Sequence, residues 1–317
     1  MGHRSTDDSA GHSTDDSTDE VADDAADLVV RLGDLDFDLW LDGDPQGPAV
    51  LMLHGFPQDH SCWDSWVAPL SRDGYRVIRI DQRGYSPGAR PRRVSDYRLA
   101  ESVADAVALL DVLGIDRVHV IGHDWGGAVA WGLASSHPDR LASVTILSTP
   151  HPEALLRAIP RSRQLAMSWY MLILQWPGLA RRVVAPGGPA WPALMRGLPR
   201  SSRSRYEARA RDPQAFDSMI AWYRAMFLDV IRPSVDWGPI AVPTLYAWGR
   251  RDPALGVQAA QRSGELVRGR YEFVVLVGHG HWLAERAGQT LVPKVLEHLR
   301  HQDSPRTDLD RAVTEDT

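Results

Sequence analysis

The hydrophobic pattern of this chain alternates between short apolar runs and longer amphipathic segments. The apolar runs predict β-strands at residues 28–32, 36–41, 49–54, 76–81, 118–121 and 143–148. Apolar positions at helical spacing predict helices at residues 61–70, 99–113 and 126–137. Gly33 lies where the first two strands would turn as a hairpin, and Gly114 follows the second helix. Strands that alternate with helices favour an α/β fold, in which helices cover both faces of a parallel sheet.

The alternation stops between residues 150 and 238, where the chain is rich in Arg, Pro and Trp and reads as helical near residues 164–174 and 216–227. Further strands are predicted at residues 244–248 and 271–277, and further helices near 257–267 and 283–299. A helical insertion between two strands of one sheet would lie over the carboxyl ends of the strands, where ligands bind. We therefore predict a core from residues 28–149 and 239–301, with residues 150–238 as a helical lid.

The negative charge of the protein lies at its two ends. The net charge is −6, but residues 1–27 carry −8 and residues 302–317 carry −3, which leaves residues 28–301 at +5. The first segment nearly repeats itself around Ser-Thr-Asp-Asp-Ser and has few apolar residues to bury. We therefore predict that residues 1–27 and 302–317 are disordered tails. The acidic first tail is either a solvated extension or an interaction segment.

Composition excludes several classes of protein. Hydrophobic residues make up 44% of the chain and charged residues 24%, as in globular proteins. Cys62 is the single cysteine, so neither a disulfide framework nor a cysteine-based metal site is expected. The chain has no apolar stretch of ~20 residues that could span a membrane, and its N-terminus lacks the pattern of a secretory signal. We expect a cytoplasmic protein without membrane association and, since no basic cluster is interleaved with aromatics, without a nucleic-acid partner.

The segment Gly122-His-Asp-Trp-Gly-Gly127 has the sequence of a nucleophile elbow, because it follows a strand and leads into a helix rich in small residues. Its glycines permit the sharp turn that exposes the side chain at position 124. That side chain is an aspartate. A carboxylate that attacks a saturated carbon forms an ester, which water can cleave, whereas a serine would form an inert ether. Asp124 therefore indicates epoxides or alkyl halides as substrates, rather than esters or amides.

A carboxylate nucleophile needs a base that activates water for the second half of the reaction, and histidine has a suitable pKa. His281 follows the last predicted strand in the segment Gly278-His-Gly-His-Trp282. Asp252 follows the preceding strand, at the same edge of the sheet, and would orient that histidine. The chain order of nucleophile, acid and histidine is the order expected for an α/β-hydrolase. His279 lies beside His281, and its own role stays open.

Backbone amides are expected to stabilise the oxyanion that forms when the ester is hydrolysed. The segment His54-Gly-Phe-Pro57 follows a predicted buried strand, where one such N–H should come from. We predict that the N–H groups of Phe56 and Trp125 form this oxyanion hole.

Four segments together resemble the epoxide hydrolase branch of the α/β-hydrolase superfamily. They are His54-Gly-Phe-Pro57, Asp81-Gln-Arg-Gly84, Gly122-His-Asp-Trp-Gly-Gly127 and Gly280-His-Trp282. The resemblance covers residues 28–300. It implies an α/β-hydrolase fold with an eight-stranded, mostly parallel sheet, a lid inserted after the sixth strand, and hydrolysis without a cofactor or metal.

In this branch two lid tyrosines bind and protonate the epoxide oxygen, since the alkoxide formed on ring opening needs a proton. Ser168-Trp-Tyr-Met171 resembles the segment that carries the first tyrosine, which implicates Tyr170. Ala221-Trp-Tyr-Arg224 resembles the second, which implicates Tyr223. Tyr206 is a further lid tyrosine, but its charged neighbours predict a solvated helix.

The resulting hypothesis is an epoxide hydrolase that forms a vicinal diol through an alkyl ester on Asp124. A dehalogenase with the same nucleophile, and a non-catalytic ligand-binding protein on this fold, remain as alternatives. The lid tryptophans indicate an apolar pocket for a small apolar, aromatic or polycyclic epoxide. We predict substrate contacts from Trp125, Trp169, His54 and Pro57, and a protein that is a monomer or a homodimer.

Overall fold

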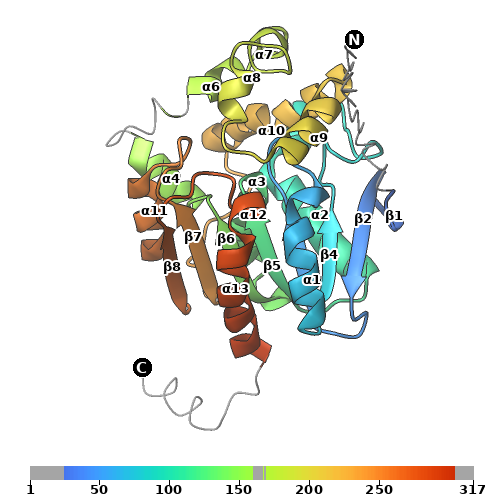
Figure 1. The fold of residues 1–317 in the computed structure, drawn as a ribbon, viewed down its shortest axis with the longest axis vertical. Helices are drawn as coiled ribbons and strands as arrows, with labels where there is room; N and C mark the ends of the chain where they lie inside the picture. The colour runs from blue at the N-terminus through green and yellow to red at the C-terminus, as the bar shows by residue number, and fades with distance from the viewer. Residues whose placement is uncertain (1–24, 160–166, 168, 304–317) are drawn as a thin grey trace, which may run out of the picture.

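An eight-stranded sheet forms the centre of the computed structural model, which describes residues 25–159, 167 and 169–303 (Figure 1). The strands are β1 (Leu28–Leu32), β2 (Leu35–Gly43), β3 (Ala49–Leu53), β4 (Arg76–Ile80), β5 (Val118–His123), β6 (Leu141–Leu147), β7 (Thr244–Gly249) and β8 (Tyr271–Leu276). Their order in the sheet is β1-β2-β4-β3-β5-β6-β7-β8. The first two strands pair antiparallel, and the other six run parallel. The expected mostly parallel, eight-stranded sheet is confirmed.

Helices cover both faces of this sheet. One face carries α1 (Asp64–Arg72), α12 (Leu283–Arg286) and α13 (Gly288–Asp303), of which α1 and α13 lie in front of the sheet in Figure 1. The other face carries α2 (Leu99–Val112), α3 (Trp125–Ser136) and α11 (Val257–Arg262). The centre of the sheet is buried on both sides: every residue of the apolar β3 and of β5 is buried, including His119 and His123 of β5. Single turns of 3-10 helix occur at His60–Trp63, Val94–Tyr97, Pro138–Arg140 and Ser263–Leu266.

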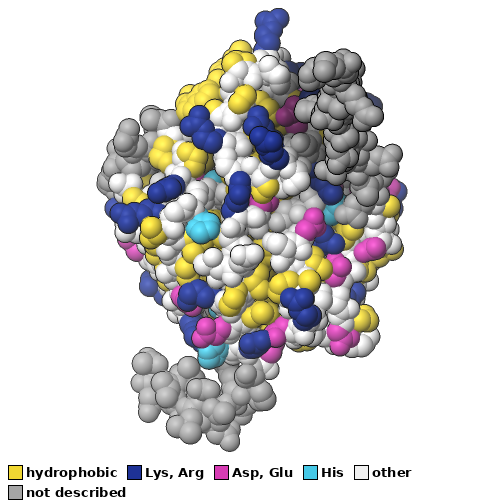
Figure 2. All heavy atoms as spheres, in the orientation of Figure 1, with side chains coloured by type: hydrophobic (Ala, Val, Ile, Leu, Met, Phe, Trp, Pro, Cys, Tyr) yellow, Lys and Arg dark blue, Asp and Glu magenta, His cyan; other side chains and the backbone are white. Residues whose placement is uncertain are grey.

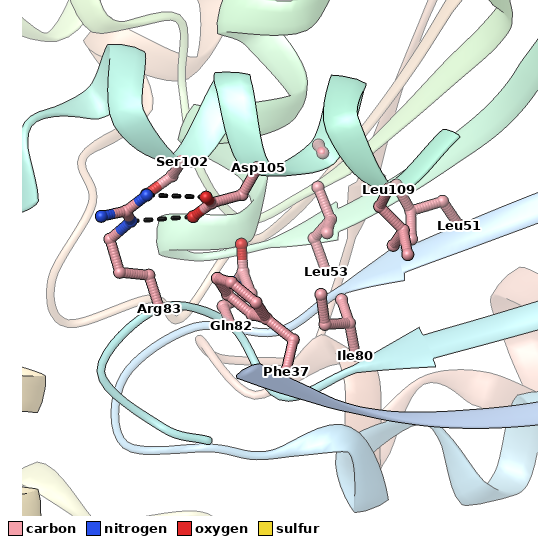
Figure 3. Close-up of a pocket in the computed structure, with 10 residues that line it drawn as sticks. Phe37, Leu51, Leu53, Ile80, Gln82, Arg83, Ser102, Asp105 and Leu109 are labelled. Carbon is pink, nitrogen blue, oxygen red and sulfur yellow. Dashed lines mark hydrogen bonds and ion pairs between the residues drawn. The ribbon is translucent and has the colours of Figure 1, made fainter. Parts of the chain in front are cut away.

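Helix α2 packs onto the sheet with almost no free space. Figure 3 shows Leu109 and Asp105 of α2 beside Leu51 and Leu53 of β3. Arg83 closes this layer, since its guanidinium donates to both oxygens of Asp105 at 2.8 and 2.6 Å. The remaining cavity has a volume of about 10 Å³. It is too small for any organic ligand.

The helices between β6 and β7 form the segment predicted as a lid. They are α4 (Pro152–Ala158), α6 (Trp169–Ile173), α7 (Pro177–Val183), α8 (Trp191–Leu194), α9 (Arg200–Ala210) and α10 (Pro213–Ile231). Figure 1 shows α6 to α10 stacked at the top of the molecule, beyond the sheet. The ring of Tyr223 in α10 packs against those of Phe56 and Trp125, so these helices lie over the carboxyl ends of β3 and β5.

Several boundaries differ from the predicted ones. The helix predicted at residues 283–299 is broken at Ala287 and then continues to Asp303, within the segment predicted as a disordered tail. Asp303 is held in place because Tyr75 donates to it at 2.9 Å and His119 Nε2 lies 3.0 Å from its other oxygen. The helix predicted at 257–267 ends at Arg262 and continues as a 3-10 turn.

Other predictions concern residues outside the described part of the chain. Residues 1–24 and 304–317 of the predicted tails, and residues 164–166 and 168 of a predicted lid helix, lie there. Two short lid helices, α7 and α8, are not predicted, because their sequences lack a continuous apolar stripe, whereas α9 contains the helix expected around Tyr206. Among the described helices, none has the length and apolar character required to cross a membrane.

Candidate active site

Asp124 occupies the tight turn between β5 and α3. Its backbone has a φ of 53° and a ψ of −119°, a combination that non-glycine residues rarely adopt. The turn is compact: a Cβ on Gly122 would lie 2.3 Å from the carbonyl oxygen of Gly126, and one on Gly126 would lie 2.0 Å from that of Leu53. Glycine is therefore required at both positions, and the turn points the carboxylate of Asp124 into a cavity.

The loop after β3 closes on this carboxylate. The backbone N–H of Phe56 donates to Asp124 Oδ1 at 2.8 Å. A Cβ on Gly55 would lie 2.3 Å from Asp124 Cβ, so the loop can approach this closely only with glycine there. The N–H of Trp125 belongs to the first turn of α3, whose amides have no acceptor within the helix. Both predicted oxyanion-hole amides thus flank Asp124.

His281 lies between two carboxylates at the carboxyl edge of the sheet. Its Nε2 is 3.4 Å from Asp124 Oδ2, and its Nδ1 is 2.9 Å from Asp252 Oδ2. Asp252 is itself fixed, because its Oδ1 accepts hydrogen bonds from the amides of Ala254 and Leu255 at 2.8 and 3.0 Å. The geometry brings the predicted nucleophile, base and acid into one hydrogen-bonding sequence.

The charges of this triad stabilise one another. Burial lowers the pKa of His281, but Asp252 and Asp124 together raise it to about 10. Burial raises the pKa of Asp124, and the stronger combined effect of His281, His123 and the Phe56 N–H brings it below its ordinary value. Asp124 is therefore ionised at neutral pH, as a nucleophile must be.

Tyr170 on α6 and Tyr223 on α10 line the same cavity as Asp124. Their rings are 6.0 Å apart and nearly perpendicular. Burial raises the pKa of both hydroxyls, and the charge of Asp124 raises each further. Both phenols are therefore protonated at neutral pH and can donate to a ligand oxygen.

The cavity has a volume of about 990 Å³ and lies between the insertion and the loops after β7 and β8. Trp169, predicted to contact substrate, lines it and is 46% exposed. The other three predicted substrate contacts, His54, Pro57 and Trp125, do not line it. His54 is fully buried: its Nε2 accepts from the amide of Gln82 at 3.1 Å, so its Nδ1 donates to the Gly55 carbonyl at 3.0 Å. It shapes the loop that carries Phe56 instead.

Comparisons with known proteins agree with this geometry. Residues 48–286 match the alpha/beta hydrolase fold family. The chain is 30% identical over 273 residues to an AB hydrolase superfamily protein of Bacillus subtilis, across 82% of this chain and 93% of that protein. It is 32% identical over 300 residues to epoxide hydrolase A of Mycobacterium tuberculosis, across 81% of this chain and 92% of that protein. This chain belongs to the epoxide hydrolase branch of the α/β-hydrolase superfamily.

The solved structure of epoxide hydrolase A from Mycobacterium thermoresistibile superposes on this α/β-hydrolase with a TM-score of 0.73. The two chains are 28% identical, and the match covers 86% of this chain and 97% of the other. The similarity therefore extends over the insertion as well as the sheet, and the resemblance inferred from four short motifs is confirmed at the level of the family.

The α/β-hydrolase also has a buried polar network that the sequence did not reveal. His123 Nε2 lies 2.8 Å from the carbonyl oxygen of His281, and His123 Nδ1 lies 2.7 Å from Gln58 Oε1. Gln58 donates to Glu285 Oε1 at 2.9 Å, and Tyr206 donates to the same oxygen at 3.0 Å. Burial raises the pKa of Glu285 to about 7, although its hydrogen bonds oppose the effect.

The only sequence signal for this network was adjacency to the motifs, since His123 precedes Asp124 and Gln58 follows Pro57. The prediction that Tyr206 lies on a solvated helix was wrong. Its side chain is fully buried, because Tyr206 lies on the side of α9 that faces the core and its hydroxyl donates to the buried Glu285. Within the described residues of this α/β-hydrolase, no group of three His, Cys, Asp or Glu side chains is placed to hold a metal ion.

Proposed function

We propose that this protein hydrolyses an epoxide to a vicinal diol through a covalent ester on Asp124. The observation that carries the proposal is the position of the Asp124 carboxylate, which shares one cavity with the hydroxyls of Tyr170 and Tyr223 and lies 3.4 Å from His281 Nε2. A carboxylate nucleophile, two proton donors and a base in one cavity match the needs of both half-reactions.

In the first half-reaction, the hydroxyls of Tyr170 and Tyr223 bind the epoxide oxygen. Asp124 attacks a ring carbon, the carbon–oxygen bond of the ring breaks, and a tyrosine gives its proton to the developing alkoxide. The high pKa of both phenols suits this role, since a proton held firmly in the resting site is transferred only when a strong base forms. A halide leaving group would have no use for that proton.

In the second half-reaction, water loses a proton to His281 and attacks the carbonyl carbon of the Asp124 ester. The negative charge that forms on oxygen is stabilised by the amides of Phe56 and Trp125. Asp252 holds the imidazole with its Nδ1 protonated and stabilises the imidazolium. The ester bond then breaks, and the departing oxygen takes the proton from His281. The second proton of water leaves the new carboxyl group of Asp124 and, through solvent, returns to the tyrosine that was deprotonated in the first half-reaction. The diol is released, and both the carboxylate and the phenol are restored.

The first half-reaction prepares the base for the second. In the resting site, the charges of Asp252 and Asp124 both raise the pKa of His281. Formation of the ester removes the charge of Asp124, so the pKa of His281 falls in the intermediate. The imidazole is therefore more readily unprotonated at the stage when it must accept a proton from water.

The size and lining of the cavity support small to medium-sized, largely apolar epoxides, including aromatic and polycyclic ones, as substrates. The proposal includes a cytoplasmic location, which fits a buried, free Cys62. It also includes function as a monomer or a homodimer.

The experiment that tests the proposal is the mass of the intact protein after incubation with styrene oxide. In a His281→Gln variant, hydrolysis of the ester should stop, and the protein should gain the full mass of the epoxide, because ring opening loses no atoms. An alkyl halide would add its mass less that of the hydrogen halide. The Asp124→Asn variant should gain nothing, and a folded His281→Gln protein that stays unmodified would contradict the proposal.

A further inference from the structure

Three arginines line the active-site cavity at its solvent-facing side. Asp124 and His281 form its buried end, whereas Arg196, Arg251 and Arg286 line the same cavity and are exposed. Exposed residues that line a cavity mark where it opens to solvent. The three guanidinium groups therefore surround the route by which a substrate enters.

Hydrogen bonds hold the three arginine-bearing segments together at this opening. Trp282 Nε1 donates to the carbonyl oxygen of Arg196 at 2.9 Å, and Arg286 Nε donates to that of Gly197 at 2.8 Å. The amide of Arg251 donates to the carbonyl oxygen of His279 at 2.9 Å. The insertion, the loop after β7 and helix α12 thus each supply one arginine to the same rim.

The charge of this rim is not compensated by neighbouring acids. Asp124 is the single acidic residue among those that line the cavity. None of the three arginines forms an ion pair within the described part of the chain, in contrast to Arg209 and Arg181 of the insertion, which pair with Asp81 and Asp217. On the face drawn in Figure 2, the upper half shows several Lys and Arg side chains and few Asp and Glu, whereas both kinds of charge lie side by side lower down.

A fourth polar group lies beside this rim. His279 lines the cavity, and its Nδ1 is buried without a hydrogen-bond partner among the described residues. Farther in, the wall is apolar, with Phe56, Met195 and Trp282 next to the catalytic groups. A ligand that matches this lining has an apolar body and an anionic end.

We propose that the preferred substrates are epoxides with a carboxylate remote from the ring, and that Arg196, Arg251 and Arg286 bind this carboxylate at the cavity opening. The inference rests on the proposed epoxide hydrolysis and specifies its substrate. Arginine suits this role, since its planar guanidinium binds a carboxylate through two parallel hydrogen bonds. The volume of about 990 Å³ leaves room for an apolar chain between the ring at Asp124 and the anion at the rim.

The test compares two substrates that differ only in charge: the terminal epoxide of ω-undecenoic acid and the corresponding primary amide. Each exposed ion pair contributes a factor of roughly two to five, so three arginines together should give the acid at least about a tenfold higher kcat/KM than the amide. Added salt should lower this ratio, because it screens exposed charges. In the Arg196→Gln, Arg251→Gln, Arg286→Gln triple variant the ratio should fall to about one.

Arg250→Gln is the matched control. Arg250 is exposed and adjacent to Arg251 but does not line the cavity, so the preference for the acid should persist in this variant. Single Arg196→Gln and Arg251→Gln variants, each expected to lose part of the preference, provide the test if the triple variant does not fold.

Turnover of styrene oxide separates the two proposals. If wild-type protein hydrolyses styrene oxide but shows equal kcat/KM for acid and amide, the carboxylate site is refuted and epoxide hydrolysis stands. If no epoxide is hydrolysed, both proposals fail together. A preference for the acid that survives in the triple variant also refutes the role of the arginines.

Discussion

Tyr206 of α9 donates its hydroxyl to Glu285 Oε1 at 3.0 Å, which connects the insertion to a carboxyl group four residues after His281. Gln58 donates to the same oxygen. Burial raises the pKa of Glu285 to about 7, so its carboxyl group gains or loses a proton near neutral pH. The junction between insertion and core is therefore sensitive to pH.

Replacement of Glu285 should alter the pH dependence of stability. In the folded protein Glu285 holds its proton up to about pH 7, whereas an ordinary glutamate releases it near 4.5. The unfolded chain thus binds fewer protons in this window, and the free energy of unfolding should fall as pH rises through it, by at most about 3 kcal/mol. Glu285→Gln keeps both hydrogen bonds and removes this titration. Urea unfolding at several pH values should show that the free energy of unfolding declines less with pH in the variant than in the wild type. An equal decline in both proteins would contradict the titration of Glu285 in this range.

Removal of the tyrosine hydroxyls should slow ring opening and leave ester hydrolysis intact. Tyr170→Phe and Tyr223→Phe each remove a proton donor, and each should slow formation of the alkyl-enzyme about 100-fold or more. Rapid quenching followed by intact-protein mass spectrometry measures this step in a single turnover. Phe at both positions should abolish it while the protein stays folded. Unchanged rates of ring opening would refute the roles of both hydroxyls.

Replacement of Asp252 should affect the other half-reaction. Asp252→Asn removes the charge that most strongly raises the pKa of His281. The asparagine also no longer holds the imidazole with its Nδ1 protonated. Breakdown of the alkyl-enzyme should slow about 100-fold or more. Because His281 acts as a base, the rate should rise with pH up to its pKa, and the midpoint should lie at lower pH in the variant. The decay of the quenched adduct across a pH series measures both quantities, and an unshifted midpoint would contradict the role of Asp252.

The anchoring of α9 should depend on one buried ion pair. Arg209 Nη1 lies 2.5 Å from Asp81 Oδ2, and Asp81 is almost fully buried. Arg209→Gln leaves this carboxylate without its main countercharge, which should lower the free energy of unfolding by about 3–5 kcal/mol. Arg211→Gln, at the residue directly after this helix, breaks only an exposed pair with Glu207 and should cost less than about 1 kcal/mol. Equal losses in the two variants would show that the Asp81 contact does not anchor the helix.

The elements that the sequence predicts well are those in which local pattern and tertiary environment agree. Every residue of β5 and most of α3 are buried and largely apolar, and the glycines between them permit a tight turn. This turn positions Asp124 at the carboxyl edge of the sheet. Asp252 and His281 lie at the same edge because they follow the ends of β7 and β8. The strand order, with β4 outside β3, depends on pairings between distant segments and could not be predicted from local pattern.

The residues that the sequence did not reveal act through contacts between distant segments. Tyr206 lies among arginines, and only the packed structure turns it inward against Glu285. His54 belongs to a recognised motif, but its ring nitrogens bond to Gly55 and Gln82 and do not reach the cavity. The motif thus predicts where the loop lies, but it does not predict which of the loop's side chains faces the ligand.

The nucleophile, the base, the acid and the Phe56 amide all come from loops at one edge of the sheet, whereas both tyrosines come from the insertion. In the proposed mechanism the core therefore contains every group that cleaves the alkyl ester of Asp124, and the insertion contains the groups that decide which leaving group is accepted. Replacement of the insertion by a different one would therefore redirect the protein toward another electrophile, while water and His281 released the product by the same chemistry as before.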